Sequence, residues 1–278
     1  MEIARTPAQL RAARAAFAAA GRPRLALVPT MGALHEGHLS LIRVARAHGD
    51  VVAASIFVNP TQFAPGEDFA RYPRDEAADC AMLAAAGCDL VWLPDVTTMY
   101  PPGDATIIDV AGPALLWEGV ARPGHFRGVA TVVAKLFGQV RPDAACFGEK
   151  DWQQVQVIRR MVDDLGLPVA VVAAPTWREA NGLAMSSRNR YLAAAERAAA
   201  PALFAALTGT RDAICAGAPV RQCVAAGEAA LVAAGFTVDY LALVDAQTLE
   251  PLSDRVGAAR LIAAARLGTT RLLDNIAV

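Results

Sequence analysis

Short apolar runs alternate with helical patterns over the first two thirds of the chain, and this alternation predicts the fold class. The apolar runs lie at 24–28, 51–58, 89–93, 144–148 and 169–173, with a weaker one at 106–110. Helical spacing of apolar residues follows at 38–47, 75–86, 126–140 and 151–165, and a cap at Thr6 begins a first helix that ends at Gly21. Continuous apolar strands separated by helices indicate a parallel sheet covered on both faces. We therefore expect an α/β, doubly wound (Rossmann-like) fold that binds its ligands beyond the carboxyl ends of the strands.

The pattern changes after Pro175, and we expect a second, smaller α+β domain there. Alanine-rich residues 192–216 and 220–234 predict two long helices, and 237–244, 259–265 and 270–273 predict strands. The expected domains are therefore 1–176 and 177–278.

Composition narrows the class of protein without changing this architecture. Hydrophobic residues make up 55% and charged residues 19% of the 278 residues, which is typical of a globular protein. A formal net charge of -1 argues against a nucleic-acid-binding surface. The sequence shows neither a signal peptide nor a membrane span, and its five cysteines form no C-x-x-C pair. These features predict a cytoplasmic protein with reduced thiols.

Residues 29–38, PTMGALHEGH, form the most informative motif because they lie between a predicted strand and a predicted helix. The unpaired N–H groups and the positive dipole end at a helix N-terminus favour an anion, and Gly32 and Gly37 permit close approach of the main chain. His35 and His38 add donors at the same place. A zinc helix is the alternative, but the second histidine comes one residue too early for H-E-x-x-H, and two further ligands would be needed. The motif predicts a phosphate-binding turn.

Two further segments follow predicted strands or open predicted helices. Asn59-Pro60-Thr61 is typical of a turn, and Gln62 after it carries an amide that both donates and accepts, which suits a hydroxy acid. Residues 122–128, RPGHFRG, form a turn before a helix in which Val132 and Val133 are core residues or an apolar wall.

Charged and hydroxyl residues recur in two later segments. Residues 147–154, FGEKDWQQ, repeat the order strand, glycine turn, charge, helix, so Lys150 can reach a phosphate and Gln154 lies one helical turn further on. A surface lysine beside a helix cap is an equally good interpretation of that segment. Residues 178–189, REANGLAMSSRN, place two hydroxyls and Arg188 in a glycine-containing loop, which indicates either an anion clamp or a polar linker.

Together these segments resemble the pantothenate synthetase (pantoate–β-alanine ligase) family of the HxGH nucleotidyltransferase-like superfamily. The resemblance rests on residues 29–38, 57–63, 67–75, 122–137, 147–154 and 178–189, in the family's order and spacing. Asn181, where an acidic residue is common, and Trp177, where we expect a small aliphatic residue near the adenine, depart from the family pattern. The C-terminal third is similar mainly in length and pattern.

The resemblance implies a two-step reaction in which the carboxylate of (R)-pantoate attacks the α-phosphorus of ATP and β-alanine then attacks the acyl adenylate. Its catalytic residues would be His38, His35, Lys150 and Arg188, and Gln62 and Gln154 would bind pantoate with Met31 against its methyl groups. ATP, with Mg²⁺ and no protein metal site, would contact Met31, Gly32, Ala33, Leu34, His35, Glu36, Gly37, His38, Gly148, Glu149, Lys150, Asp151, Trp177, Met185, Ser186, Ser187 and Arg188.

The resemblance and the apolar composition further imply a homodimer formed through the N-terminal domain, and a C-terminal domain that closes over ATP as a lid. Neither nucleic acid nor a membrane is an expected partner. Three other functions are considered: a related HxGH nucleotidyltransferase with a different acceptor, a relative of the aminoacyl-tRNA synthetases, and a nucleotide sensor without activity. The first would need an additional basic pocket for a phosphorylated acceptor, and the second a basic RNA-binding domain.

Overall fold

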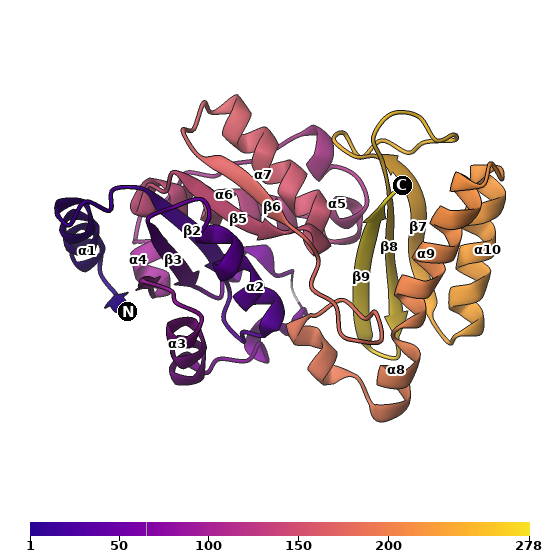
Figure 1. The fold of residues 1–278 in the computed structure, drawn as a ribbon, viewed down its shortest axis with the longest axis horizontal. Helices are drawn as coiled ribbons and strands as arrows, with labels where there is room; N and C mark the ends of the chain where they lie inside the picture. The colour runs from indigo at the N-terminus through magenta and orange to yellow at the C-terminus, as the bar shows by residue number, and fades with distance from the viewer. Residues whose placement is uncertain (65) are drawn as a thin grey trace. The chain divides into compact units, whose positions relative to one another are not determined.

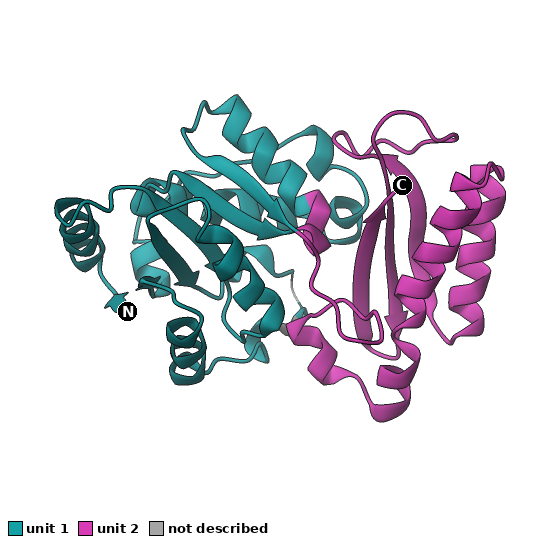
Figure 2. Cartoon of the chain, viewed as in Figure 1, with its two compact units in different colours: residues 1–148, 154–174 teal, residues 149–153, 175–278 magenta. Residues whose placement is uncertain are grey.

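The computed structural model describes residues 1–64 and 66–278, which divide into two units. Unit 1 comprises residues 1–148 and 154–174, and unit 2 comprises residues 149–153 and 175–278 (Figure 2). The second unit thus begins close to the expected boundary at 176 but also takes residues 149–153, which the sequence pattern assigns to the first domain. The chain passes between the units at 148/149, 153/154 and 174/175.

Unit 1 is built on a parallel six-stranded sheet with the order β1-β4-β3-β2-β5-β6, which confirms the doubly wound fold (Figure 1). Its strands are β1 (Glu2–Ala4), β2 (Leu25–Thr30), β3 (Val51–Ile56), β4 (Leu90–Trp92), β5 (Ala144–Gly148) and β6 (Ala170–Ala174). Successive strands β3 and β4 extend the sheet on one side of β2, and β5 and β6 extend it on the other. The order therefore reverses between β2 and β5, the position at which sheets of this kind bind ligands.

Helices cover both faces of this sheet because its strands are apolar on both sides. Leu25 and Leu27 of β2 pack in one apolar cluster with residues of α1, α6 and α7, whereas Ala26 and Val28 pack in another with residues of α2 and α3. This alternation follows from the two-residue period of a strand. The helices of this part of the chain are α1 (Pro7–Ala19), α2 (Glu36–Ala45), α3 (Glu76–Ala85), α4 (Val96–Met99), α5 (Glu118–Ala121), α6 (His125–Val140) and α7 (Trp152–Asp164).

Unit 2 packs two long helices on an antiparallel three-stranded sheet, as expected for an α+β domain. Its strands are β7 (Thr237–Asp245), β8 (Ala259–Leu267) and β9 (Thr270–Ala277), and its helices are α8 (Ala194–Ala199), α9 (Ala202–Cys215) and α10 (Val220–Ala233). Leu203, Leu207 and Leu231 of the helices and Leu261 of β8 are fully buried in its core.

Two sequence predictions of secondary structure are wrong. The predicted helix over 192–216 is two helices, because Pro201 between α8 and α9 lacks an N–H group and cannot continue a helix. Residues 106–110 form no strand, and the Ile108 N–H donates to the Thr131 hydroxyl (3.0 Å) instead of to a neighbouring strand. In the described part of the chain, no helix is long and apolar enough to cross a bilayer.

Candidate functional site

The turn after β2 is held in shape by its own residues and by one buried carboxylate. Gly32 and Ala33 have positive φ angles of 76° and 52°, and the Gly32 N–H donates to the Thr30 hydroxyl at 3.2 Å. A Cβ at Gly32 would lie 2.7 Å from an Asp79 carboxylate oxygen, so glycine is required for space as well as for conformation.

Asp79 of α3, which the sequence analysis did not single out, fixes this turn. Its carboxylate is 4% exposed and accepts the N–H groups of Ala33 (2.9 Å) and Leu34 (2.8 Å). A buried carboxylate is costly unless it is hydrogen-bonded, so these two contacts account for its burial. The sequence offered one indication of this buried carboxylate: Asp79 lies four positions before Leu83, on the apolar face of a predicted helix.

The two histidines of the motif lie together at the start of α2. His35 is the N-cap residue, α2 begins at Glu36, and the His35 and His38 rings are 4.1 Å apart between centroids. Glu36 is exposed and pairs with Arg43 along the helix (3.4 Å), and Gly37 lies in the first helical turn instead of in the loop. The structure therefore presents two adjacent imidazoles beside the N–H groups of a helix N-terminus.

Gln62 lies in the 3-10 helix η1 (Pro60–Gln62), and its amide contacts the histidine-bearing turn. The Gln62 Nε2 group is 2.9 Å from the Met31 sulfur, and its Oε1 accepts from the Asn59 side chain at 3.1 Å. Asn59 is 1% exposed, and it also donates to the Gly128 carbonyl (3.1 Å) and accepts from the Tyr100 hydroxyl (2.8 Å). This network fixes which way the Gln62 amide faces.

Helix α6 lies close enough to η1 to hold the Gln62 main chain. A Cβ at Gly128 would lie 2.3 Å from the Thr61 carbonyl oxygen, so the glycine permits the approach. The His125 Nδ1 atom is 2.9 Å from the Gln62 carbonyl, and Arg122 reaches the same carbonyl at 3.4 Å. The sequence motif 122–128 was identified correctly as a turn before a helix, but its contact with residue 62 is not a local property.

The protonation state of His125 follows from its partners. A carbonyl only accepts and a guanidinium only donates, so Nδ1 carries the proton and Nε2 accepts from Arg122 (3.1 Å). Burial and the neighbouring Arg122 cation lower the pKa of His125 from 6.5 to about 4. Arg122 itself forms a double contact with the Glu67 carboxylate, at 2.8 Å for each oxygen. His125 is therefore neutral at pH 7.

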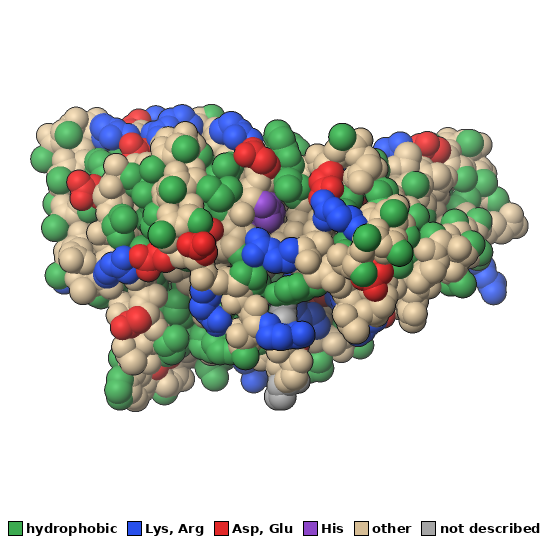
Figure 3. Space-filling model, turned by 90° about the horizontal axis from the view of Figure 1, so that it is seen from below, with side chains coloured by type: hydrophobic (Ala, Val, Ile, Leu, Met, Phe, Trp, Pro, Cys, Tyr) green, Lys and Arg blue, Asp and Glu red, His purple; other side chains and the backbone are tan. Residues whose placement is uncertain are grey.

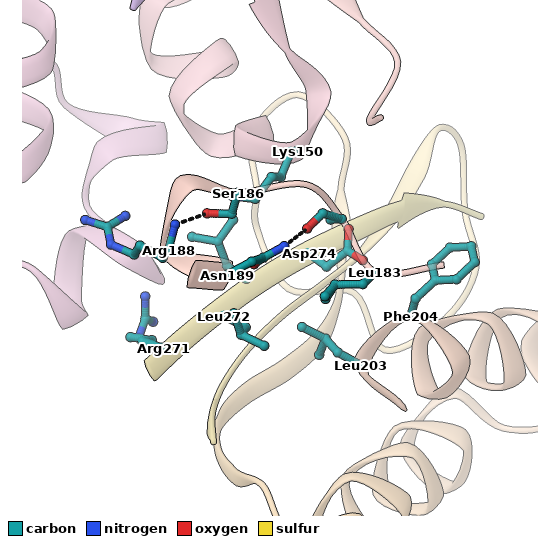
Figure 4. A pocket seen from close by; sticks show the side chains of 12 residues that line it. Lys150, Leu183, Ser186, Arg188, Asn189, Leu203, Phe204, Arg271, Leu272 and Asp274 are labelled. Carbon is teal, nitrogen blue, oxygen red and sulfur yellow. Dashed lines mark hydrogen bonds between the residues drawn. The ribbon is translucent and has the colours of Figure 1, made fainter. Parts of the chain in front are cut away.

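In unit 2, cationic side chains line an open pocket, whose empty space together with the solvent at its mouth is about 400 Å³ (Figure 4). Lys150, Arg188 and Arg271 line it together with the Ser186 hydroxyl, and Leu183, Leu203 and Phe204 contribute apolar wall. Ser186 caps the 3-10 helix η5 (Ser187–Tyr191) and accepts the Arg188 N–H at 3.3 Å. The one carboxylate among the lining residues, Asp274, is paired with Arg178. Of the three cations, Arg271 is paired with Asp239 (2.6 Å) and Lys150 lies 3.4 Å from Asp151. The pocket suits an anion.

The remaining predicted residues occupy several elements. Gly148 ends β5, Glu149, Lys150 and Asp151 form the 3-10 helix η4, and Gln154 lies in α7. The sequence suggested that Lys150 and Gln154 lie one turn apart on a single α-helix. The structure instead places Lys150 in η4 and Gln154 in α7. Trp177 is 44% exposed, and its carbonyl accepts the Met185 N–H at 2.9 Å, which closes the loop between them. The Asn181 side chain accepts the Leu183 N–H (3.1 Å), a contact that an aspartate would also make.

The chain thus combines a doubly wound sheet, with paired imidazoles after a central strand, and a second unit with a cation-lined pocket, features that suit an α/β enzyme acting on phosphate-bearing ligands. The sequence pattern of the family described as Pantoate-beta-alanine ligase matches residues 2–277. The chain belongs to this family.

Individual relatives agree with the family assignment over the full length. The pantothenate synthetase of Acidiphilium cryptum (strain JF-5) is 67% identical over 278 residues, which cover 100% of both chains. A crystal structure of pantothenate synthetase from Thermus thermophilus has a TM-score of 0.94 and 53% identity, and 99% of each chain is covered. A pantoate-beta-alanine ligase from Francisella tularensis, crystallised with beta-gamma ATP and beta-alanine, has a TM-score of 0.82 and 32% identity, covering 100% of this chain and 97% of that one.

Proposed function

We propose that this chain joins (R)-pantoate to β-alanine with ATP, through a pantoyl adenylate and with release of pyrophosphate and AMP. The observation that carries the proposal is the contact between the Gln62 amide and Met31, 2.9 Å apart. Met31 belongs to the turn that presents His35 and His38, so an amide suited to a hydroxy acid and two donors suited to phosphate occur at one place in unit 1. Membership in the pantoate-beta-alanine ligase family supports the same reaction.

The first step requires positioning and charge neutralisation, because the pantoate carboxylate is itself the nucleophile. His38 and His35 stabilise the negative charge that develops on the phosphates as the carboxylate attacks the α-phosphorus and pyrophosphate leaves. Imidazole N–H groups and the α2 N-terminus supply hydrogen bonds without moving during the reaction. Gln62 and Gln154 orient pantoate by its polar oxygens, and Met31 packs against its methyl groups.

Unit 2 supplies the groups that hold the triphosphate. Lys150 and Arg188 are cations that neutralise the leaving pyrophosphate, and Ser186 and Ser187 donate hydroxyl hydrogen bonds to it. Main-chain and side-chain atoms of residues 31–38, 148–151, 177 and 185–188 contact the rest of ATP, including the adenine beside Trp177. In the second step the β-alanine amine attacks the acyl carbonyl, and AMP leaves.

We propose that Mg²⁺ arrives bound to ATP and is held mainly by the phosphates. No group of three or more metal-binding side chains that could hold an ion occurs among residues 1–64 and 66–278. Asp151 is half exposed and lies beside Lys150 (3.4 Å), so it fits a single-carboxylate contact to a phosphate-bound ion better than a site of its own. The ion would add positive charge at the phosphates when bound.

A related nucleotidyltransferase that acts on a phosphorylated acceptor is the alternative. Such an acceptor would need an uncompensated cation near Gln62, whereas pantoate carries no phosphate to satisfy. The cation found there, Arg122, already forms its double contact with Glu67. On the face drawn in Figure 3, acidic and basic side chains are mixed with apolar ones, which is unlike a nucleic-acid-binding surface. The pairing of Arg122 with Glu67 favours the carboxylate substrate, and the mixed charge on this face gives no support to a nucleic-acid acceptor.

We further propose a cytoplasmic homodimer whose interface is formed by unit 1. Ile107, Leu115 and Val120 are 63%, 64% and 70% exposed, and they lie within fourteen residues of one another along the chain. Large apolar side chains exposed in one segment are typical of a surface covered by a partner. The proposed cytoplasmic location would keep the thiols of all five free cysteines reduced. Sedimentation that shows only monomer at micromolar concentration would refute the dimer.

We also propose that unit 2 closes over ATP as a lid that keeps water from the acyl adenylate. Arg188 then contacts the triphosphate in the closed state. Arg188→Ala should lower the rate of adenylation and release AMP without an equal amount of pantothenate. If Arg188→Ala keeps a one-to-one ratio of AMP to pantothenate and an unchanged affinity for ATP, the 178–189 loop does not act as part of a lid.

The reaction itself is tested by incubating the protein with ATP, Mg²⁺, pantoate and β-alanine, each omitted in turn. Pantothenate and AMP should form together only in the complete mixture. Transfer of AMP to a phosphorylated acceptor instead would support the alternative, and nucleotide binding without any product would indicate a sensor.

A further inference from the structure

Strand β9 carries two adjacent buried polar residues in the sheet of unit 2. Asp274 is 3% exposed and Asn275 is 4% exposed. A buried carboxylate and a buried amide destabilise a protein unless their hydrogen-bonding groups are satisfied. Each of these residues has a partner in or beside one of the two segments that the proposed function assigns to phosphate binding.

Asn275 holds the turn that contains Lys150. Its amide nitrogen donates to the main-chain carbonyls of Glu149 (2.9 Å) and Lys150 (2.8 Å). Its amide oxygen accepts from Arg260, and Arg260 also reaches the Glu149 carboxylate at 3.3 Å. The Arg260 guanidinium stacks on the Trp152 ring at 3.7 Å from its centroid. The turn is therefore attached to the sheet on both sides of Lys150.

Asp274 holds the loop that leads to Ser186 and Arg188. Its carboxylate accepts two bonds from the Arg178 guanidinium, at 2.5 and 2.9 Å. Arg178 donates to the Gly182 carbonyl (3.1 Å) and stacks on the Phe204 ring at 3.8 Å. The Asn275 N–H also donates to the Asp274 carboxylate (2.7 Å), which links the two anchors directly.

We propose that Asp274 and Asn275 are positioning residues that hold the Lys150 turn and the 178–189 loop on one strand, so that both phosphate-binding segments keep a fixed spacing. The proposal rests on the proposed function. It explains why residues 149–153 belong to unit 2 although the chain on either side of them belongs to unit 1. Lys150 and Arg188 consequently line one pocket (Figure 4).

Asn275→Asp is the sharpest variant because it keeps the size of the side chain and the acceptor for Arg260. It places a carboxylate oxygen, in place of a donor, against two carbonyl oxygens. In pantoate-dependent exchange of pyrophosphate into ATP, the KM for ATP should rise about 10- to 100-fold, since two buried hydrogen bonds are lost. The KM for pantoate should stay within about twofold, because no pantoate-binding residue is touched.

A double-mutant cycle separates positioning of Lys150 from a general loss of structure. If Asn275 acts through Lys150, adding Asn275→Asp to Lys150→Ala should change the KM for ATP by less than about twofold. A double variant whose KM for ATP rises by the product of the two single fold-changes would overturn the proposal. A normal KM for ATP in Asn275→Asp, when Lys150→Ala is impaired, would overturn it too. Asn275→Ala, which removes the donor without adding charge, carries the same expectations if the aspartate variant does not fold.

Leu231→Ala is the matched control for destabilisation. Leu231 is fully buried in unit 2 but does not line the pocket, so its removal should lower the melting temperature and leave the KM for ATP unchanged. An increase in this KM equal to that of Asn275→Asp would overturn the proposal. Absence of pantoate-dependent exchange in the unsubstituted protein would instead refute the proposed function. Normal exchange in Lys150→Ala would show that Lys150 does not bind phosphate, and the positioning role of Asn275 would then fail as well.

Discussion

His125 is a buried titratable residue whose ring holds the Gln62 main chain. Protonation of this ring in acid should therefore destabilise the folded protein. The folded state holds His125 neutral, with its pKa lowered to about 4, whereas the unfolded chain protonates near 6.5. The unfolded state therefore binds more protons between these two values, and stability must fall as the pH falls from about 6.5 to about 4. Above pH 6.5 the contribution of His125 to stability is fully present.

The size of this effect follows from the two pKa values. Their difference, at 1.36 kcal/mol per pKa unit, is about 3 kcal/mol, of which about 2 kcal/mol is lost by pH 5. His125→Asn is the matched variant, because an asparagine amide nitrogen can still donate to the Gln62 carbonyl and does not titrate. The three other histidines are the same in both proteins, since the chain contains four.

Denaturant unfolding of both proteins at pH 7 and pH 5 measures the difference. The unsubstituted protein should lose about 2 kcal/mol more than His125→Asn over this interval. Histidine NMR supplies an independent check, in which the His125 resonance should not titrate between pH 5 and pH 8. Equal pH dependence of the two proteins, or a His125 midpoint near 6.5, would refute the reasoning about the buried neutral ring.

Four further variants test the candidate site. His38→Ala should slow adenylation by roughly 10²-fold with a similar melting temperature, because one preorganised donor to the phosphates is lost, and near-normal turnover would exclude this role. Gln62→Ala and Gln154→Ala should weaken pantoate binding by about 1–3 kcal/mol and ATP binding much less, and equal losses for both ligands would contradict the assignment. Asp79→Asn should lower the melting temperature and adenylation together, because an amide cannot accept both N–H groups without opposing one of them; unchanged thermal unfolding and exchange rates would show that the turn holds its shape alone.

The main elements of unit 1 could be predicted from the sequence because buried parallel strands are continuous apolar runs. The run at 144–148 has the same bounds as β5, and the run at 51–58 extends two residues beyond the end of β3. Strand β1 (Glu2–Ala4) escaped prediction because three residues give too short a pattern, and it is defined by pairing with β4. Pro201 indicates a helix end, but the alanine-rich residues on both sides of it continue the helical pattern. The sequence therefore predicted one helix where the structure has α8 and α9.

The local part of the candidate site could likewise be recognised. The strand, glycine turn and helix around His35 and His38 are specified within ten residues, and the structure places both rings together. The contacts of Asp79, His125 and Asn275 could not be predicted in this way. Asp79 reaches a turn 45 residues earlier in the chain, and Asn275 reaches a turn 125 residues earlier, so only the folded chain brings these groups together.

The division of phosphate-binding residues between two units was also beyond the sequence pattern. Lys150 follows β5 directly, so the pattern places it in the first domain, yet its main chain is bonded to Asn275 of β9. Asp274 and Asn275 lie between Leu273 and Ile276 in β9, and two adjacent polar residues between apolar ones are the sign of long-range contacts that the sequence offers there.

Pyrophosphate exchange tests the central claim most directly, because it isolates formation of the acyl adenylate. Labelled pyrophosphate should enter ATP when the protein is supplied with ATP, Mg²⁺ and pantoate. β-Alanine should not be required, because adenylation is reversible and precedes amide formation. Exchange that appears only when β-alanine is present would contradict the two-step reaction.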